Sequence, residues 1–366
     1  MNTKSFIFGT GTSRSGLSLA SNLLSTNKRV IMTNDLIHFF RYIYNKYNPV
    51  NDTDKQLLII KELCLRLKYR NRITLPFQKI FDHFKNVNNY SDVLDSLNSF
   101  LLNENPGKEI IGESANTEWR NIENLLEMNN NYKAYQVIRD PRAVLSSFKK
   151  LTSAKNYEYL DIIFFWVDAV NYKIKYEKKY NDGRYLSIKF ENIHKFPEEN
   201  VKKLCNFVNV DYDYNMMNVK NWPKILNSKY FHVNTSAYNN KKVFGFSKNR
   251  ISNWNNNLEE WEIALIQFLL KDYLKMLDYE LIDCSEQMTR KGLDIIESSK
   301  NLNNLLTNFK KDNSGTNTRS SDPTKPENWG ATDLSKNPNL KFIDTDDYKN
   351  YMRELNLIRT NYNDGI

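Results

Sequence analysis

The sequence predicts an α/β protein with three layers, in which helices cover both faces of a central, mostly parallel β-sheet. Short apolar runs with the composition of buried strands alternate with amphipathic helical patterns, as in chains built from βαβ units. In addition, a Gly/Ser/Thr-rich turn over residues 9–16 joins the first apolar run directly to the first helical pattern. Ligands of such sheets bind at the carboxyl ends of the strands, so we expect the functional residues there.

Five segments have the composition of buried strands. They span residues 4–8, 29–32, 108–112, 133–138 and 185–190. The helical spacing of apolar residues, together with Pro141 at the first position of one helix, predicts the helices between them. These helices cover residues 17–24, 36–44, a stretch that begins at 141, 157–180, 198–208 and 258–277.

By composition, the chain divides into one domain, a linker and a tail. Residues 1–285 form the predicted domain, and apolar positions at helical spacing predict a helical insertion over residues 54–105. Residues 286–326 are expected to be a polar linker, because most of them are Ser, Asn, Thr, Lys or Pro. The tail, residues 327–366, holds one expected short helix and is too small to fold alone. We therefore expect it to pack on the domain or on a partner.

The composition is that of a globular protein. Of 366 residues, 40% are hydrophobic and 26% are charged, which argues against a disordered, collagen-like or coiled-coil chain. There is no apolar run long enough for a membrane span or a secretion signal, and three widely spaced cysteines form no disulfide framework, so we predict a cytoplasmic protein. The 52 Lys and Arg against 43 Asp and Glu give a net charge of +9, but their scatter disfavours nucleic-acid binding.

The glycine-rich turn has the outline of a phosphate-binding loop. In such a turn, backbone N–H groups and the positive end of the following helix together attract an anion. Gly11 and Gly16 have the spacing of the ATP-binding P-loop, but Leu17 replaces its lysine. A cation two residues before the second glycine, Arg14, is left to serve an anion. A turn without a ligand is the alternative interpretation.

A second segment combines an arginine at a strand end with a serine eight residues later. Arg139 follows the fourth expected strand, Pro141 starts a helix, and Ser147 falls on the side of its first two turns that can face the strand end. Guanidinium and hydroxyl are thus able to converge on one anion. A plain ion pair of Arg139 with Asp140 is the alternative interpretation.

Four segments, in this order, resemble the sulfotransferases that use 3′-phosphoadenylyl sulfate (PAPS). Residues 11–18 are similar to the family's 5′-phosphosulfate loop, and residues 139–147 to its 3′-phosphate site. Residues 186–208 resemble a strand, proline and helix of the family's carboxyl-terminal half, and residues 250–279 resemble the loop and helix that close over the nucleotide. The resemblance covers residues 4–282 and implies the P-loop NTPase-like sulfotransferase fold.

Carried over by position, the resemblance implies where PAPS, the expected co-substrate, binds. The 5′-phosphosulfate would lie against Thr12, Ser13, Arg14, Ser15, Gly16, Leu17 and Ser18. The 3′-phosphate would lie against Arg139 and Ser147, and Lys248 and Arg250 are equal candidates for a further loop contact. Trp254 either stacks near the nucleotide or anchors that loop in the core.

The implied reaction is an in-line transfer of the sulfo group to a hydroxyl acceptor, with an amine as the second choice. As in phosphoryl transfer, the protein aligns the two reactants and stabilises charge on the leaving phosphate, and Arg14 is the natural cation for this. No metal is expected, because the histidines lack any metal-binding spacing. They are His38, His83, His194 and His232.

The acceptor also needs a general base, which in family members that act on carbohydrates and proteins is typically a carboxylate just after the second strand. Asp35 holds that place, so we predict that it is the base, although it is equally suited to cap a helix starting at Leu36. His38 is the second candidate. Glu113 resembles a stretch of the glycan-modifying members, but Ser114 replaces the lysine found there.

Two other function classes stay open at this point. A P-loop kinase or NTPase would turn over Mg-ATP, whereas an interaction protein that retains the fold would use the basic charge and the tail helix and bind nucleotide weakly or not at all. The acceptor is equally open, because sugars, lipids, peptide tyrosines and small alcohols all offer a hydroxyl. The oligomeric state is not indicated.

Overall fold

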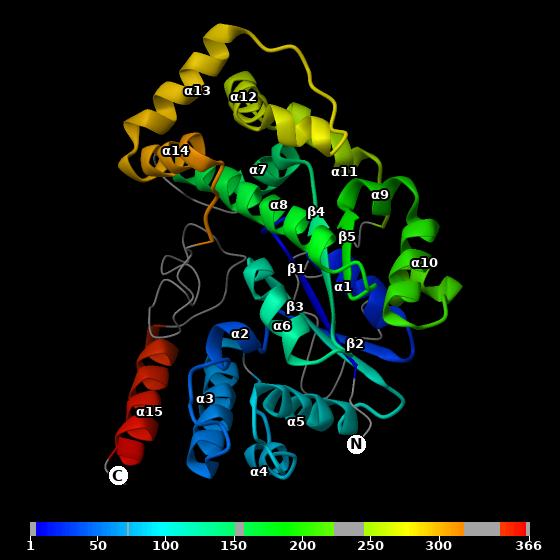
Figure 1. The fold of residues 1–366 in the computed structure, drawn as a ribbon, viewed down its shortest axis with the longest axis vertical. Coiled ribbons are helices and arrows are strands. Elements are labelled where there is room, and N and C mark those ends of the chain that lie inside the picture. The colour runs from blue at the N-terminus through cyan, green and yellow to red at the C-terminus, as the bar shows by residue number, and fades with distance from the viewer. Residues whose placement is uncertain (1–4, 72, 151–156, 223–244, 318–344, 364–366) are drawn as a thin grey trace.

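The structure is a computed structural model of the chain, and it describes residues 5–71, 73–150, 157–222, 245–317 and 345–363. In these residues, one sheet of five parallel strands forms the centre of the molecule, in the order β2-β3-β1-β4-β5 (Figure 1). The strands are β1 (Phe6–Gly11), β2 (Val30–Asn34), β3 (Ile110–Asn116), β4 (Lys133–Ile138) and β5 (Tyr185–Lys189). The five predicted strands and the parallel α/β architecture are confirmed.

The side chains of each strand alternate between two hydrophobic clusters, one on each face of the sheet. In β1, Phe6 and Phe8 belong to the first cluster and Ile7 to the second. In β4, Ala134 and Tyr135 divide in the same way. Because successive side chains of a strand point to opposite faces, this alternation means that the sheet is buried on both sides. The predicted three-layer arrangement is therefore confirmed.

Helices from different parts of the chain cover the two faces. The second cluster is completed by α1 (Leu17–Thr26) and α10 (Pro197–Val208). The first cluster is completed by α6 (Ile122–Met128), α7 (Pro141–Lys149) and α8 (Asp161–Lys179). In the part of the chain that the structure describes, none of the helices has both the length and the apolar composition of a membrane span.

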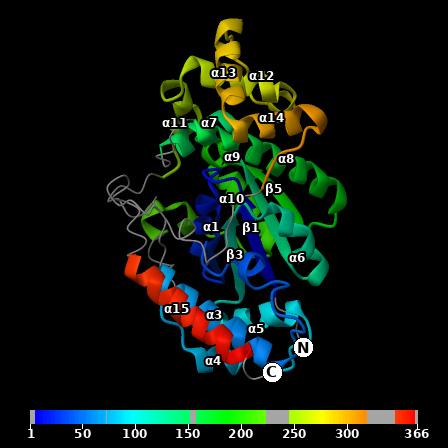
Figure 2. The same ribbon diagram turned by 90° about the vertical axis from the view of Figure 1, so that its left-hand side faces the viewer.

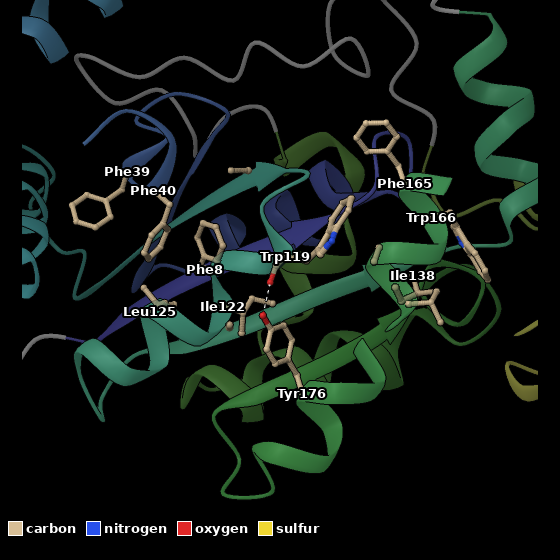
Figure 3. Packing of buried hydrophobic residues seen from close by; sticks show 14 of the residues in the cluster. Phe8, Phe39, Phe40, Trp119, Ile122, Leu125, Ile138, Phe165, Trp166 and Tyr176 are labelled. Carbon is tan, nitrogen blue, oxygen red and sulfur yellow. Dashed lines mark hydrogen bonds between the residues drawn. The ribbon is translucent and has the colours of Figure 1, made fainter. Parts of the chain in front are cut away.

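Aromatic side chains fill the layer between the sheet and α6 and α8 (Figure 3). Trp119, Trp166 and Tyr176 are almost fully buried there. Tyr176 donates a hydrogen bond to the backbone carbonyl of Trp119 at 2.9 Å, so its hydroxyl is satisfied inside an apolar layer. Full burial of one phenylalanine, such as Phe8, contributes about 1.5–3 kcal/mol to stability.

The segment between β2 and β3 is helical, as predicted for residues 54–105. It contains the short α2 (Phe39–Tyr42), α3 (Thr53–Asn71), α4 (Phe77–Phe81) and α5 (Tyr90–Asn103). The helix predicted over residues 36–44 is shorter than expected. It begins only after His38, because that residue has a left-handed φ of +50° that no α-helix accommodates.

The prediction of a polar linker over residues 286–326 is wrong for its first part. The chain forms α13 (Glu286–Ser298) and α14 (Lys300–Asp312), which pack on α12 (Glu260–Met276) and α8 at one end of the molecule (Figure 1). Leu302, Leu306 and Phe309 repeat with helical spacing and are buried. The Asn and Lys residues that suggested a linker cover the exposed faces of these helices. Residues 318–326 lie outside the described residues.

The tail contributes one helix, α15 (Thr345–Asn363), which lies along α3 (Figure 2). With 19 residues it is longer than the predicted short helix. Residues 327–344 lie outside the described residues. Tyr351 and Leu355 are buried in a cluster with Leu65 and Tyr69 of α3. The contact is flanked by two ion pairs, Lys68 with Glu354 and Arg359 with Glu62.

Candidate active site

All five strands end at one edge of the sheet, and most candidate residues lie directly after those ends. The loop 12–16 follows β1, Asp35 follows β2, Arg139 follows β4 and Phe190 follows β5. Because β1 lies between β3 and β4, this edge contains the point where the strand order reverses, which is where parallel α/β sheets bind their ligands. Residues that are far apart in the sequence thus meet where a ligand is expected.

The loop after β1 presents backbone groups to this edge. The amide of Ser15 donates to the carbonyl of Thr12 at 3.0 Å, which closes a tight turn. Gly16 has a φ of +96°, and a Cβ there would lie 2.2 Å from a ring carbon of Phe190, so a side chain is strongly disfavoured. Among the described residues, no acidic side chain lies in the first turn of the ten-residue α1 and none caps it. Its partial positive charge is therefore available to an anion.

Leu17 supplies no side chain to this edge. Its side chain is buried in the second hydrophobic cluster, which also contains Ile7 and Val201. In an ATP-binding P-loop this position carries the lysine that reaches the β- and γ-phosphates. Here only the backbone amide of Leu17 is available, so a kinase or NTPase would lack its main phosphate contact.

Three arginines converge beside the loop. Arg14 donates through Nε to the hydroxyl of Ser147 at 2.8 Å, and Arg139 donates to the backbone carbonyls of Arg14 and Arg250 at 2.9 and 3.0 Å. Burial lowers the pKa of all three guanidinium groups, and that of Arg139 falls to about 10. The nearby carboxylates of Glu191 and Asp140 raise the pKa of Arg139, whereas the charges of Arg14 and Arg250 lower it, so a bound anion would offset the repulsion among the three cations. The cluster is therefore suited to bind a highly charged anion.

Ser147 lies close to the arginine cluster, but its partner differs from the one the sequence suggested. Its hydroxyl contacts Arg14, while Arg139 packs over the ring of Phe190, with Cζ 4.1 Å from the ring centroid. The indole of Trp166 donates to the carbonyl of Arg139 at 2.8 Å and fixes the end of β4. Asp140 forms its ion pair with Arg142 at 2.7 Å and not with Arg139, so the alternative interpretation of Arg139 as a plain ion pair with Asp140 is wrong.

In the loop that precedes α12, Arg250 is better placed than Lys248 to contact an anion beside Arg139. Arg250 lies on α11 (Asn249–Ser252) and is half-buried beside Arg139, whereas Lys248 is exposed. Trp254 is buried, with the guanidinium of Arg142 4.0 Å from its ring centroid. Trp254 therefore anchors this loop in the core, which was the second of its two predicted roles.

Asp35 is exposed at the end of β2 and has a positive φ of +49°. Its carboxylate accepts hydrogen bonds from the backbone amide and the side-chain amide of Asn116, at 3.1 and 2.7 Å. It does not cap a helix, because α2 begins at Phe39 and its cap residue is His38. Asp35 is thus an exposed carboxylate whose orientation is fixed by the end of β3.

The other two candidate bases are buried. His38 packs edge-on against the ring of Tyr42, and Glu113 of β3 is 2% exposed. The carboxylate of Glu113 accepts the backbone amides of His38 and Phe39 at 2.6 and 3.3 Å, and burial raises its pKa to about 7. Of the three, Asp35 alone is exposed at the surface.

Backbone strain also marks this edge. Four residues other than glycine adopt positive φ next to the strand ends: Arg14, Asp35, His38 and Thr117. Such a conformation costs of order 1–3 kcal/mol for each residue and persists where surrounding contacts enforce it, most often in functional sites. No sequence pattern singled out Thr117, a β-branched residue for which this conformation is rare.

Sequence reasoning missed His194, on α9 (Phe190–Lys195). Its Nδ1 accepts the backbone amide of Ser247 at 3.0 Å, and its ring centroid lies 4.4 Å from that of Phe190. His194 thereby ties the loop that carries Arg250 to the end of β5. The sequence held no signal for this contact, because the two residues are 53 positions apart.

His194 is expected to make the protein sensitive to acid. Burial and the charges of Arg250 and Arg139 lower the pKa of His194 to about 4, whereas a histidine in the unfolded chain titrates near 6.5. The contribution of neutral His194 to the unfolding free energy is complete above the pKa that the histidine has in the unfolded chain. It is lost as the pH falls toward the pKa of His194 in the folded protein. We expect the unfolding free energy, measured with urea from about pH 7 to about pH 4, to fall less steeply in His194→Asn. Equal slopes would contradict this assignment.

Within the described ranges, no group of three or more His, Cys, Asp or Glu side chains is arranged to hold a metal ion. His232 lies outside those ranges. The chemistry that the described residues offer is a cluster of partly buried arginines, a helix amino terminus and an exposed carboxylate. These groups bind and neutralise an anion and accept a proton.

Known proteins match both the sequence and the fold. A model of the sulfotransferase family matches residues 6–214. The sulfotransferase domain of the Synechococcus PCC 7002 olefin synthase superposes with a TM-score of 0.53 at 16% identity, covering 77% of this chain and 97% of that domain. The sulfotransferase domain from the curacin biosynthetic pathway has a TM-score of 0.49 at 14% identity, with 76% and 99% covered. Mouse sulfotransferase SULT7A1, solved with PAP, has a TM-score of 0.42 at 13% identity, with 76% and 89% covered.

The sequence search of curated proteins found no match. At 16% identity, the likeness to the olefin synthase domain is a likeness of fold. The family model is the stronger finding, because its match runs from β1 through β5 to the residues after α10 and so includes every strand that forms the site. The chain belongs to the sulfotransferase family.

Proposed function

We propose that this protein transfers a sulfo group from PAPS to a hydroxyl acceptor. One observation carries the proposal: Arg14, Arg139 and Arg250, all partly buried, lie together beside the amino terminus of α1. PAPS has a phosphosulfate at one end and a phosphate at the other, so its negative charges suit a cluster of three cations.

The residues divide between the two ends of the donor. The loop 12–18 and the start of α1 would hold the 5′-phosphosulfate, and Arg139 with Ser147 would hold the 3′-phosphate. Arg14 touches Ser147 at 2.8 Å, so it lies between these two groups of residues and is placed to neutralise charge on the leaving phosphate. Arg250 would close the site from the loop that His194 ties down.

In the transfer step, the acceptor oxygen forms a bond to sulfur while the bond from sulfur to the phosphate oxygen breaks. Asp35 accepts the proton of the acceptor hydroxyl, and 3′,5′-ADP leaves with the electron pair. Asp35 suits this role because it is exposed while Asn116 fixes its orientation. The helical insertion α3–α5 follows Asp35 in the chain, and we propose that it borders the acceptor.

Titration calorimetry with 3′,5′-ADP and, separately, with Mg-ATP tests the proposal. We expect 3′,5′-ADP to bind in the micromolar range, near −8 kcal/mol, and at least about tenfold more tightly than Mg-ATP. Incubation with labelled PAPS and fractionated acceptor extracts should then label one fraction. Turnover of Mg-ATP would instead favour a kinase or NTPase, and a folded protein without affinity for either nucleotide would favour an interaction protein.

A further inference from the structure

The segment that carries Asp35 and His38 passes between two buried charged side chains. On one side lies Arg66 of α3, and on the other lies Glu113 of β3, and both are 2% exposed. They come from different elements and have opposite charges. Neither has a role in the transfer step proposed above.

Both side chains bind the backbone of this segment. Arg66 donates through Nη1 to the carbonyl of Leu36 at 2.8 Å and through Nη2 to the carbonyl of Ile37 at 2.6 Å. Glu113 accepts the next two backbone amides, those of His38 and Phe39. Four consecutive residues, 36–39, are therefore held by one guanidinium and one carboxylate. Hydrogen bonds to charged groups are stronger than those between neutral groups, so this grip is firm.

We propose that Arg66 and Glu113 are positioning residues that fix the general base at the acceptor site. This inference rests on the proposed function, in which Asp35 is that base. The two side chains act through the backbone of residues 36–39, which they hold next to Asp35. We name this pair with its four backbone contacts the 36–39 clamp.

The conformation of the segment explains why a clamp is needed. Asp35 and His38 both have positive φ, at +49° and +50°, which a peptide segment without support rarely adopts twice in four residues. The amide of Asp35 also donates to the carbonyl of Ser114 at 2.8 Å, so the segment is held from its first residue to its last. Strain that is enforced by surrounding contacts is typical of groups set in place for catalysis.

The burial of two opposite charges supports the same conclusion. A buried arginine and a buried glutamate most often pair directly, because desolvation penalises each of them alone. Here both side chains bind peptide groups of residues 36–39, and the attraction of Arg66 acts on Glu113 across the segment. Hydrophobic side chains would fill this space at a lower desolvation cost. The presence of two charged side chains is therefore explained by their hydrogen bonds to the backbone of residues 36–39.

The tail helix lies behind the clamp. The guanidinium of Arg66 lies 4.4 Å from the ring centroid of Tyr42, and both residues line a cavity of about 270 Å³. Tyr351 and Arg359 of α15 line the same cavity from the other side. The Arg66 side of the clamp thus borders a cavity that α15 helps to enclose.

Two measurements on the full chain distinguish whether Arg66 and Glu113 position Asp35 or only cap the start of α2. The first is hydrogen exchange at the amides of residues 36–39, which needs no substrate. The second is release of labelled sulfate from PAPS to water, in which the water oxygen bonds to sulfur, the bond to phosphate breaks, Asp35 takes the proton and 3′,5′-ADP leaves. Water serves as the acceptor, so the natural acceptor need not be known.

We expect Glu113→Gln to raise the exchange rate of the His38 and Phe39 amides at least about tenfold. Sulfate release should fall by about 10- to 100-fold, as for other groups that orient a catalytic residue, while the affinity for 3′,5′-ADP stays within about twofold. Arg66→Met should lose more turnover than Arg66→Lys, which keeps the charge and one donor group. The matched control is Asp168→Asn, which alters a carboxylate of similar burial that binds Trp119 and Arg120 instead.

Two results would overturn the clamp. The first is unchanged exchange at residues 36–39 in Glu113→Gln. The second is sulfate release within about twofold of wild type in both Glu113→Gln and Arg66→Met, while Asp35→Asn is inactive. The proposed function fails in a different way, because the wild-type protein would then neither bind 3′,5′-ADP nor release sulfate, and the catalytic role of the clamp would fall with it.

Discussion

Arg139→Ala is expected to weaken binding of 3′,5′-ADP by roughly a hundredfold, or about 3 kcal/mol. Arg139 is partly buried at the end of β4, and its guanidinium is the centre of the arginine cluster, since it donates to the carbonyls of both Arg14 and Arg250. Its loss removes one charge from the anion site and releases two segments that line it. Titration calorimetry measures the effect directly.

Two further variants sharpen this prediction. Arg139→Lys keeps the charge but not the planar fork, so we expect an intermediate loss of about tenfold. Arg29→Ala removes the same charge at the opposite edge of the sheet, where Arg29 forms an exposed ion pair with Glu109, and should leave affinity within about twofold. Equal losses in Arg139→Ala and Arg29→Ala would mean that only net charge matters. Full affinity in Arg139→Ala would remove the arginine cluster from the donor site.

Asp35→Asn is expected to lower turnover by about 10²- to 10⁴-fold, which is the usual contribution of a general base. Affinity for 3′,5′-ADP should be unchanged, because Asp35 contacts Asn116 and none of the arginines beside the loop 12–16. Asparagine tolerates positive φ as aspartate does and keeps one oxygen for the Asn116 amide, so the fold should survive. Initial rates with labelled PAPS, together with calorimetry, separate the two effects.

The matched control is Asp52→Asn. Asp52 is also an exposed carboxylate, and it accepts the backbone amide of Asp54 at the start of α3. We expect its turnover to stay within about twofold of wild type. If Asp35→Asn keeps a third or more of the activity, Asp35 is not the base, and His38 becomes the candidate to test by His38→Gln.

The apolar runs predicted all five strands, but not where three of the strands end. β1, β2 and β3 each continue for two to four residues past the predicted end, through residues such as Thr10 and Glu113. Both side chains are buried, although they are polar, because backbone groups satisfy them: Thr10 donates to a carbonyl and Glu113 accepts two amides. Hydropathy marks where apolar residues stop, whereas a strand continues for as long as its neighbours pair with it.

Composition misled the prediction where polar residues cover a buried stripe. In α14, three apolar side chains at helical spacing face the core, and Asn and Lys occupy most other positions. A count over the whole segment therefore suggests a linker, and only the spacing of Leu302, Leu306 and Phe309 reveals the helix.

The sequence indicated which residues belong to the candidate site, but it did not indicate which of them contact one another. The residues came from short motifs at strand ends, and a parallel sheet brings such ends to one edge. The contacts of the site join residues that are 29 to 133 positions apart. They are the hydrogen bonds of Arg14 with Ser147, of Arg66 with the carbonyls of Leu36 and Ile37, and of His194 with Ser247. No local pattern encodes contacts over such distances, because tertiary packing sets them.

The packing of α15 on α3 has a consequence for how the chain is made. Arg359 and Glu62 are 297 positions apart, and Lys68 and Glu354 are 286 apart, so this contact closes one of the longest loops in the protein. During synthesis, α3 leaves the ribosome long before α15 does, and domains fold as they emerge. Until α15 has been synthesised, the side chains of Leu65 and Tyr69 are exposed to solvent, and chaperones or neighbouring chains can bind them. A transcript truncated before α15 would thus yield a chain that contains all five strands but exposes the apolar side chains of α3, and such a chain is prone to aggregate.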